Sequence, residues 1–196
     1  MLTTTPSELT EDVLDFCKEV ETSTPFFVEV KPADFARPNF CFQNVETQIE
    51  NFSGKKCYGW EIWYKKGMII EAEFHCIWQS PEGRFLDITP KMDGERKILF
   101  LPSHKIYKNK RIDNIRKNLS DSPIIDLYIE CAKKTVSKFT TNKIILNKEL
   151  GWWSGFLLNM FMHNLKSNSS LCLCGSGREF RKCCKKRILD FLKKIN

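Results

Sequence analysis

A cysteine, a histidine and an aspartate in the first half of the chain have the types and the spacing for thiol chemistry. Cys41 follows Asn39, which can cap a helix running from about residue 40 to residue 52. The positive end of a helix dipole stabilises a thiolate, and backbone N–H groups there can stabilise an oxyanion. His75 and Asp87 follow on two strands of a hairpin. Together the three residues could supply a nucleophile, a general base and the carboxylate that orients the base.

The hairpin is predicted from local pattern. The strand that carries His75 alternates apolar and polar residues, which puts the imidazole on the more polar face. The Ser-Pro-Glu-Gly segment that follows is typical of a type I turn ending on a left-handed glycine, and it pairs Ser80 with Arg84. This register sets Asp87 opposite Ile77. The carboxylate is then the diagonal neighbour of the imidazole on one face.

An aromatic-rich strand over residues 57–64 precedes the hairpin, and a Lys-Lys-Gly turn joins it by pairing Tyr64 with Met68. That register sets Cys57 opposite His75, so Cys57 is a second candidate nucleophile. The interior of a strand offers a thiol no helix dipole, so the cysteine at the helix start is preferred. Cys57 could instead belong to a metal site or simply fill space. The metal site would add His75, Asp87 and Glu73.

The same register sets Glu61 opposite Glu71. Two facing carboxylates can raise the pKa of one of them. Neighbouring lysines make two exposed, solvated glutamates the plainer expectation, so neither is assigned a role. Cys41 also has a plain alternative, as an apolar residue of a buried first turn.

The order of these residues resembles that of transglutaminase-like and other papain-like cysteine enzymes. The similarity covers residues 38–100. Phe-His-Cys-Ile-Trp at 74–78 and Phe-Leu-Asp-Ile-Thr-Pro at 85–90 look like the His-x-Trp and Asp-x-Thr elements of that family, with one extra residue between His and Trp. The resemblance implies a catalytic triad for amide hydrolysis, deamidation or acyl transfer on a protein or peptide substrate. Its members would be Cys41, His75 and Asp87.

Length and composition bound the architecture. A chain of 196 residues that is 42% hydrophobic accommodates one globular domain and a small appendage. We expect an α+β fold, an antiparallel β-meander flanked by helices, over residues 1–166, with the possible papain- or transglutaminase-like core at 38–102. The N-terminus lacks the basic start and apolar run of a signal peptide, and the most apolar segment, 150–162, is too short to span a membrane. Nine cysteines, an odd count, favour reduced thiols and a metal over a secreted disulfide scaffold, so we expect a cytoplasmic location.

The most specific motif lies near the C-terminus, where a Cys-x-Cys-Gly-Ser-Gly segment precedes a pair of adjacent cysteines. Four thiolates bind zinc tetrahedrally, and the glycines permit a tight turn between the two pairs. Four protein ligands leave no open position for water, so the zinc would be structural. The predicted ligands are Cys172, Cys174, Cys183 and Cys184.

Residues 171–187 resemble the SEC-C motif, a zinc-binding segment named for the C-terminus of the preprotein translocase motor. The resemblance implies a small module at 167–196, made of the motif and a terminal helix, that docks a protein partner and contacts nucleic acid or ribosomes. Its many lysines and arginines leave a basic surface. A second basic segment, 104–117, could attract nucleic acid or an acidic partner, although such runs are usually solvated. The sequence therefore leaves two functions open, a thiol enzyme and a non-enzymatic adaptor.

Overall fold

The computed structural model describes residues 3–108, 110, 112–139 and 144–195. The chain divides into two compact units, Met1–Lys117 and Asn118–Asn196, here called unit 1 and unit 2. The predicted boundary between residues 166 and 167 falls inside unit 2, and a separate module at 167–196 stays a prediction. Among the residues described, no helix has the length and apolar character needed to cross a membrane.

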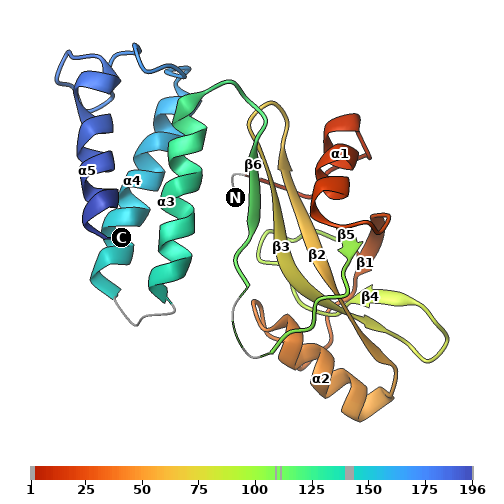
Figure 1. The fold of residues 1–196 in the computed structure, drawn as a ribbon. Coiled ribbons are helices and arrows are strands. Elements are labelled where there is room, and N and C mark those ends of the chain that lie inside the picture. Colours follow the sequence, from red (N-terminus) through yellow and green to blue (C-terminus); the bar gives the residue numbers. More distant parts are fainter. Residues whose placement is uncertain (1–2, 109, 111, 140–143, 196) are drawn as a thin grey trace. The chain divides into compact units, whose positions relative to one another are not determined.

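Unit 1 is built on a small closed barrel of five strands (Figure 1). The strands are β1 (Phe26–Val30), β2 (Lys55–Lys65), β3 (Ile69–Gln79), β4 (Phe85–Asp87) and β5 (Lys97–Pro102). They run in the order β2-β5-β1-β4-β3, and pairing of β2 with β3 closes the barrel. The short strand β6 (Ile115–Asn118) pairs with β3. The predicted α+β fold with antiparallel strands is confirmed, and the closure adds one parallel pair, β1 with β4.

The turn between β3 and β4 has the predicted form. The Ser80 N–H donates to the Arg84 carbonyl at 2.8 Å, and Gly83 adopts the left-handed φ of +86° that this loop requires. Trp78 then pairs with Leu86. That is the predicted register, and it puts the β4 aspartate on the face of β3 that carries the histidine.

The loop between β2 and β3 consists of residues 66–68 rather than the predicted 65–67. Tyr64 therefore pairs with Ile70 rather than Met68. The Met68 N–H donates to the Lys65 carbonyl at 3.0 Å, with Gly67 at φ +63° as the third residue of the turn. The predicted loop ended on this glycine, whereas the observed four-residue turn has the glycine at its third position. The whole β2 register therefore moves by two residues.

The shifted register corrects two predictions. Gly59, not Cys57, lies opposite His75, and Glu61 lies opposite Glu73 rather than Glu71. A side chain at Gly59 would have its Cβ only 2.4 Å from the carbonyl oxygen of Leu101, so the glycine lets β5 approach β2 closely.

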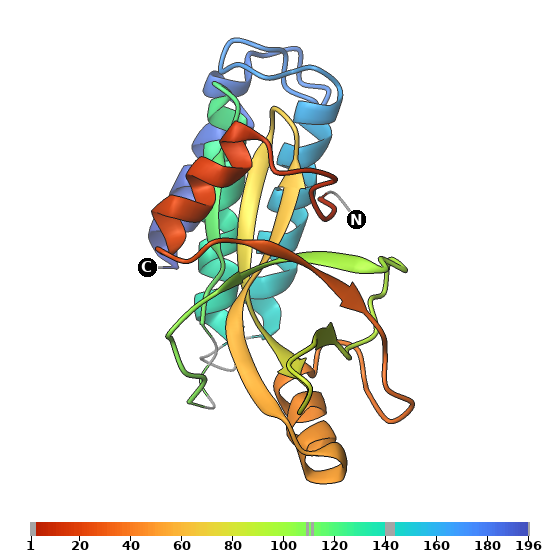
Figure 2. The same ribbon diagram turned by 90° about the vertical axis from the view of Figure 1, so that its right-hand side faces the viewer.

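Two helices complete unit 1, α1 (Glu11–Val20) near the tip of the β2–β3 hairpin and α2 (Cys41–Phe52) near its open end (Figure 2). The first helix buries Val13, Phe16 and Cys17. The second packs on β3 through an apolar cluster. The buried members of that cluster are Cys41, Val45, Cys76, Trp78 and Ile88.

Unit 2 contains α3 (Pro123–Phe139), α4 (Ile144–Met162), the 3-10 helix η1 (Phe180–Lys182) and α5 (Cys184–Lys194). Ser122 caps α3, since its Oγ accepts the Ile124 N–H at 3.3 Å. The α4 helix ends at Met162, because Asn164 adopts φ +61° and the Leu165 N–H turns back to the Met160 carbonyl. This is the Schellman arrangement that terminates helices.

Candidate functional site

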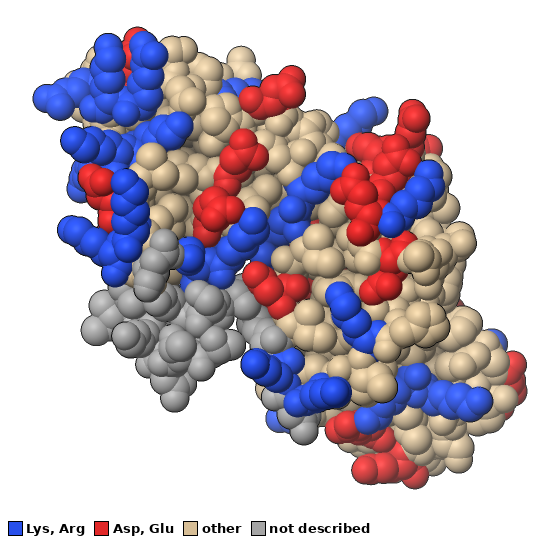
Figure 3. Space-filling model, in the orientation of Figure 1, with Lys and Arg blue, Asp and Glu red and all other residues tan. Residues whose placement is uncertain are grey.

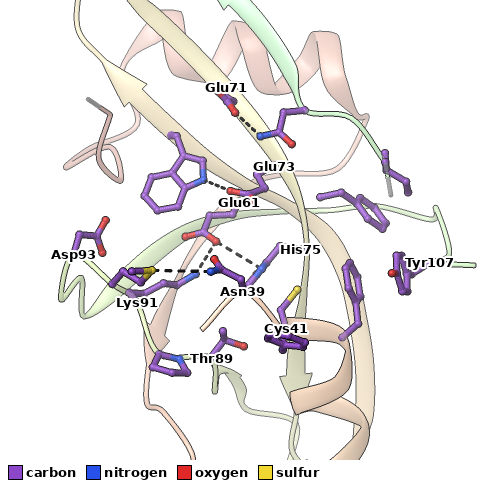
Figure 4. A pocket seen from close by; sticks show the side chains of 18 of the residues that line it. Asn39, Cys41, Glu61, Glu71, Glu73, His75, Thr89, Lys91, Asp93 and Tyr107 are labelled. Atoms are coloured by element: carbon purple, nitrogen blue, oxygen red, sulfur yellow. Dashed lines mark hydrogen bonds and ion pairs between the residues drawn. The ribbon is translucent and has the colours of Figure 1, made fainter. Parts of the chain in front are cut away.

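A cavity of about 560 Å³ opens in unit 1 beside the predicted thiol residues (Figure 4). Its walls come from the start of α2, one face of β2 and β3, and the segment that follows β4. Thr3, Tyr107, Ile112 and Asn114 complete the lining. Both Cys41 and His75 line this cavity. The structure thus brings the predicted nucleophile and the predicted base to one place, while their catalytic roles stay predictions.

His75 and Asp87 form a buried pair. Their Nε2 and Oδ2 atoms are 2.9 Å apart, and the residues are 6% and 0% exposed. The other oxygen of Asp87 accepts the N–H of Thr89 at 2.9 Å, which fixes the carboxylate. An ionised carboxylate only accepts hydrogen bonds, so the proton between the two residues belongs to the imidazole Nε2. Nδ1 is then the ring nitrogen left for proton transfer.

Cys41 is the first residue of α2, and the predicted cap is wrong. Phe40 occupies the N-cap position, and no side chain described at this helix end forms a capping hydrogen bond. Asn39 instead adopts the left-handed φ of +67°, rare for a residue with a side chain, and its amide points to the sulfur of Met92. The first-turn N–H groups of α2 are therefore free of a side-chain cap.

The Cys41 thiol is within the electrostatic reach of the imidazole. Figure 4 shows the Cys41 side chain extending from the helix start toward the ring of His75. A thiolate at this position acts to raise the pKa of His75. The residue is 7% exposed, so it is both part of the apolar cluster under α2 and part of the cavity wall. The position of Cys41 is thus compatible both with packing in the apolar cluster and with reaction as a nucleophile in the cavity.

Burial alone would lower the pKa of His75, but the negative charges of Asp87, Cys41 and Glu61 together outweigh burial and hold this pKa well above its usual value of 6.5. The reverse holds for Asp87, where burial would raise the pKa and the charges of His75 and Lys91 lower it. The electrostatics thus favour a charged imidazolium beside an ionised aspartate.

Lys91 and Glu61 belong to the same network, and sequence reasoning assigned a role to neither. The Lys91 Nζ lies 2.6 Å from Glu61 Oε2 and 2.8 Å from Asp87 Oδ2, and its side chain is 8% exposed. Burial would lower the pKa of Lys91, but the two carboxylates raise it. Burial raises the pKa of Glu61, against the opposing charges of His75 and Lys91.

The expectation of an exposed Glu61 is wrong, because Glu61 is only 2% exposed. The polar face of β3 is the inner face of the barrel, where Ile98 and Phe100 of β5 pack against Ile77. The available signal was the position of Glu61 on the odd-numbered face of β2. That face is shared with His75 in the predicted register as well as in the observed one, because a shift of two residues keeps every side chain on its face.

A metal site in this cavity has little room for its ion. Glu61, His75 and Asp87 have ligand atoms within 4.8 Å of one another. However, the ammonium of Lys91 contacts both carboxylates and already supplies the cation. Cys57, the alternative nucleophile and ligand, packs against an apolar cluster contributed by β1, β3 and β5, and burial raises the pKa of its thiol.

Unit 2 holds a second group of candidate ligands, in which four sulfur atoms lie within 4.8 Å of one another. They are the predicted Cys172, Cys174, Cys183 and Cys184. The first and second pairs meet through a 3.5 Å contact between Cys174 and Cys183, close to the roughly 3.8 Å that separates sulfurs around a zinc ion with bonds of about 2.3 Å. Gly175 and Gly177 both have positive φ, as the predicted tight turn requires. This cluster could hold a metal ion.

Lysine and arginine side chains gather over α5 on the face shown in Figure 3. Within the helix they come from Lys185, Lys186, Arg187, Lys193 and Lys194. The predicted basic surface around the cysteine cluster therefore exists in unit 2. Its partner is not identified by these residues.

Searches of protein-family models, of curated proteins and of solved structures find no match to this chain. Its function must therefore be inferred from its own residues and their geometry.

Proposed function

We propose that unit 1 is a thiol enzyme that acts on a carbonyl carbon of an amide or related acyl group in a protein or peptide. One observation carries the proposal. The imidazole of His75 is fixed through Nε2 by the buried carboxylate of Asp87, and Cys41 lines the same cavity as the first residue of a helix. A nucleophile, a base and an orienting group with these relations define the triad arrangement.

In the proposed reaction, His75 holds the thiol proton and Cys41 is the thiolate. Its sulfur attacks the carbonyl carbon and forms an S–C bond, while the uncapped N–H groups of α2 stabilise the oxyanion. The C–N bond then breaks as the imidazolium gives its proton to the leaving amine. Water attacks the resulting thioester, and His75 takes a proton from it. The S–C bond breaks, and a carboxylic acid leaves. An amine in place of water would give acyl transfer.

The charge balance of the cavity is consistent with this chemistry. The carboxylates of Glu61 and Asp87 are matched by Lys91 and by protonated His75. Transfer of the thiol proton to His75 leaves the net charge of the cavity unchanged: it makes the imidazolium that matches the second carboxylate, and it makes a thiolate on Cys41, where the dipole of α2 is favourable. Lys91 keeps Asp87 ionised, so that Asp87 can orient the ring without taking its proton.

The cysteine cluster of unit 2 would bind zinc in a structural role, as its resemblance to the SEC-C motif implies. A tetrathiolate zinc ion would hold the loop between residues 172 and 184 without taking part in the thiol reaction. In the second candidate function, unit 2 is an adaptor, and the basic surface over α5 favours it. A protein or nucleic-acid partner would then dock there whether or not Cys41 reacts.

An ester substrate tests the enzyme proposal directly. We expect p-nitrophenyl acetate to release a stoichiometric burst of nitrophenol and to leave an acetyl group on Cys41, which peptide mass spectrometry can locate. Cys41→Ala and His75→Ala should both remove the burst. An unmodified Cys41 in the wild-type protein, under conditions where free thiols react, would refute the enzyme and leave the adaptor.

A further inference from the structure

The cavity has an acidic wall in a protein whose net charge is +7. Among its lining residues are four carboxylates and a single lysine. The carboxylates are Glu61, Glu71, Glu73 and Asp93, and the lysine is Lys91. A wall of this sign attracts a cation, whereas the charge of the whole chain would attract an anion.

Two of these carboxylates are already matched by cations of the chain. Lys91 lies 2.6 Å from Glu61, and the Arg116 Nε lies 3.3 Å from Glu71 Oε2. No ion pair in the described part of the chain includes Glu73 or Asp93, and of these two Asp93 is exposed whereas Glu73 is half-buried. The Glu73 Oε2 accepts the indole N–H of Trp63 at 3.0 Å, which holds the carboxylate without neutralising it. Glu73 is thus an oriented negative charge at the cavity wall.

A second, independent feature also points to a missing donor. Glu61 lines the cavity and is 2% exposed, yet its Oε1 has no hydrogen-bond partner among the residues described. A buried acceptor without a donor is unfavourable, and it signals a water or a ligand group that completes the site. Glu61 and Glu73 are cross-strand neighbours, so the oxygen without a donor and the carboxylate without an ion pair lie on the same face.

From these observations we propose that the cavity binds an alkylammonium group of the substrate, such as a lysine side chain, through Glu73. Trp63 already occupies one oxygen of this carboxylate, so a single-point contact from an ammonium suits it better than the two-point contact of a guanidinium. Aromatic rings of the lining, including Trp63, Phe42 and the stacked Tyr107, add favourable faces for a cation.

The position of Glu73 relates this group to the reacting atoms. Glu73 lies two residues before His75 on β3, about 7 Å along the same face. A lysine side chain has that reach from its own backbone carbonyl. This inference rests on the proposed function in treating the ammonium as part of a substrate. Binding of the ammonium itself requires no reaction at Cys41.

The test uses full-length Cys41→Ala protein, so that no chemistry occurs, and two probes of the same shape. N-acetyl-lysine methylamide carries the ammonium, and N-acetyl-norleucine methylamide replaces it with a methyl group. Titration followed by NMR should give at least tenfold tighter binding of the lysine probe, and weaker binding at higher salt. Glu73→Gln keeps an acceptor for the Trp63 N–H and should remove most of the preference.

Glu50→Gln is the matched control, because it removes the same charge from an exposed position of α2 outside the cavity lining. It should leave the preference intact. Equal binding of the two probes, no binding of either, or a preference that survives Glu73→Gln would overturn the inference. A lysine preference in a protein whose native Cys41 is inert would instead refute the thiol enzyme and retain the ammonium site.

Discussion

Replacing Lys91 with methionine removes the only ammonium that lies between Glu61 and Asp87 in the described structure. The new side chain has a similar length, so the change is chiefly electrostatic. In the variant, Asp87 Oδ2 still has the His75 Nε2 as a partner at 2.9 Å. For Glu61, the nearest remaining cationic atom is the His75 Nδ1, 3.7 Å from its Oε2. Breaking a buried ion pair by removing one partner costs about 3–5 kcal/mol, and we expect Lys91→Met to fall in that range at pH 7.5.

The pH dependence gives the sign of the effect. The folded-state pKa of Glu61 is raised above its usual value of 4.5, and it rises further when the lysine is lost. Between 4.5 and that raised pKa the folded state of the variant binds more protons than the unfolded state. The variant therefore gains stability as the pH falls through this window, by about 1.4 kcal/mol for each further unit of pKa shift. The deficit of Lys91→Met should shrink between pH 8 and pH 5.

Hydrogen exchange of peptides from β2 and β3 measures this loss within unit 1, because their slowest amides report its global opening. The double variant Glu61→Gln/Lys91→Met is the control, since it removes the unmatched carboxylate together with the ammonium. It should be more stable than Lys91→Met alone. A single variant that loses less than about 1 kcal/mol and shows no pH dependence would refute the buried network, because an exposed pair contributes that little.

Three further predictions concern the orienting carboxylate, the barrel and the cysteine cluster. Asp87→Asn removes the charge that raises the pKa of His75, so that pKa should fall and alkylation of Cys41 at pH 6 should slow, as followed by peptide mass spectrometry. Gly59→Ala should lower the unfolding free energy of unit 1 by about 1–3 kcal/mol in hydrogen exchange, because its Cβ would meet backbone at 2.4 Å; Gly151→Ala, with open space around it in α4, should instead stabilise. Elemental analysis should find one zinc per chain, and a chelator should release it and make the four clustered cysteines alkylatable, whereas a chain without zinc would contradict the proposed metal site.

Local signals in the sequence predicted the local structure. The bounds of α2, Cys41–Phe52, lie within one residue of the predicted range 40–52. The loop between β3 and β4 was predictable because Gly83 fixes it. That loop alone brings Asp87 to the face of His75, and so the histidine–aspartate pair could be inferred without knowledge of the barrel.

The barrel and the network inside it depend on contacts that sequence patterns do not encode. Pairing of β5 with both β1 and β2 completes the barrel that encloses the face that alternation had marked as polar, and this pairing joins residues far apart in the chain. Lys91 reaches Glu61, thirty residues earlier, only after that closure. The two-residue error in the β2 register had a local cause, the place of Gly67 in its turn. It changed the cross-strand partner of Glu61 from Glu71 to Glu73 but left Glu61 on the same face.

The central claim is that Cys41 is a reactive thiol paired with His75, and alkylation of native protein by iodoacetamide between pH 5 and pH 9 tests it most directly. Peptide mass spectrometry would read each cysteine, with zinc present to protect the cluster in unit 2. We predict rapid labelling of Cys41 below neutral pH and slower labelling in His75→Ala, because the imidazolium stabilises the thiolate. A Cys41 that stays unlabelled, or that reacts only at the pH of an ordinary thiol and is indifferent to His75→Ala, would contradict the claim.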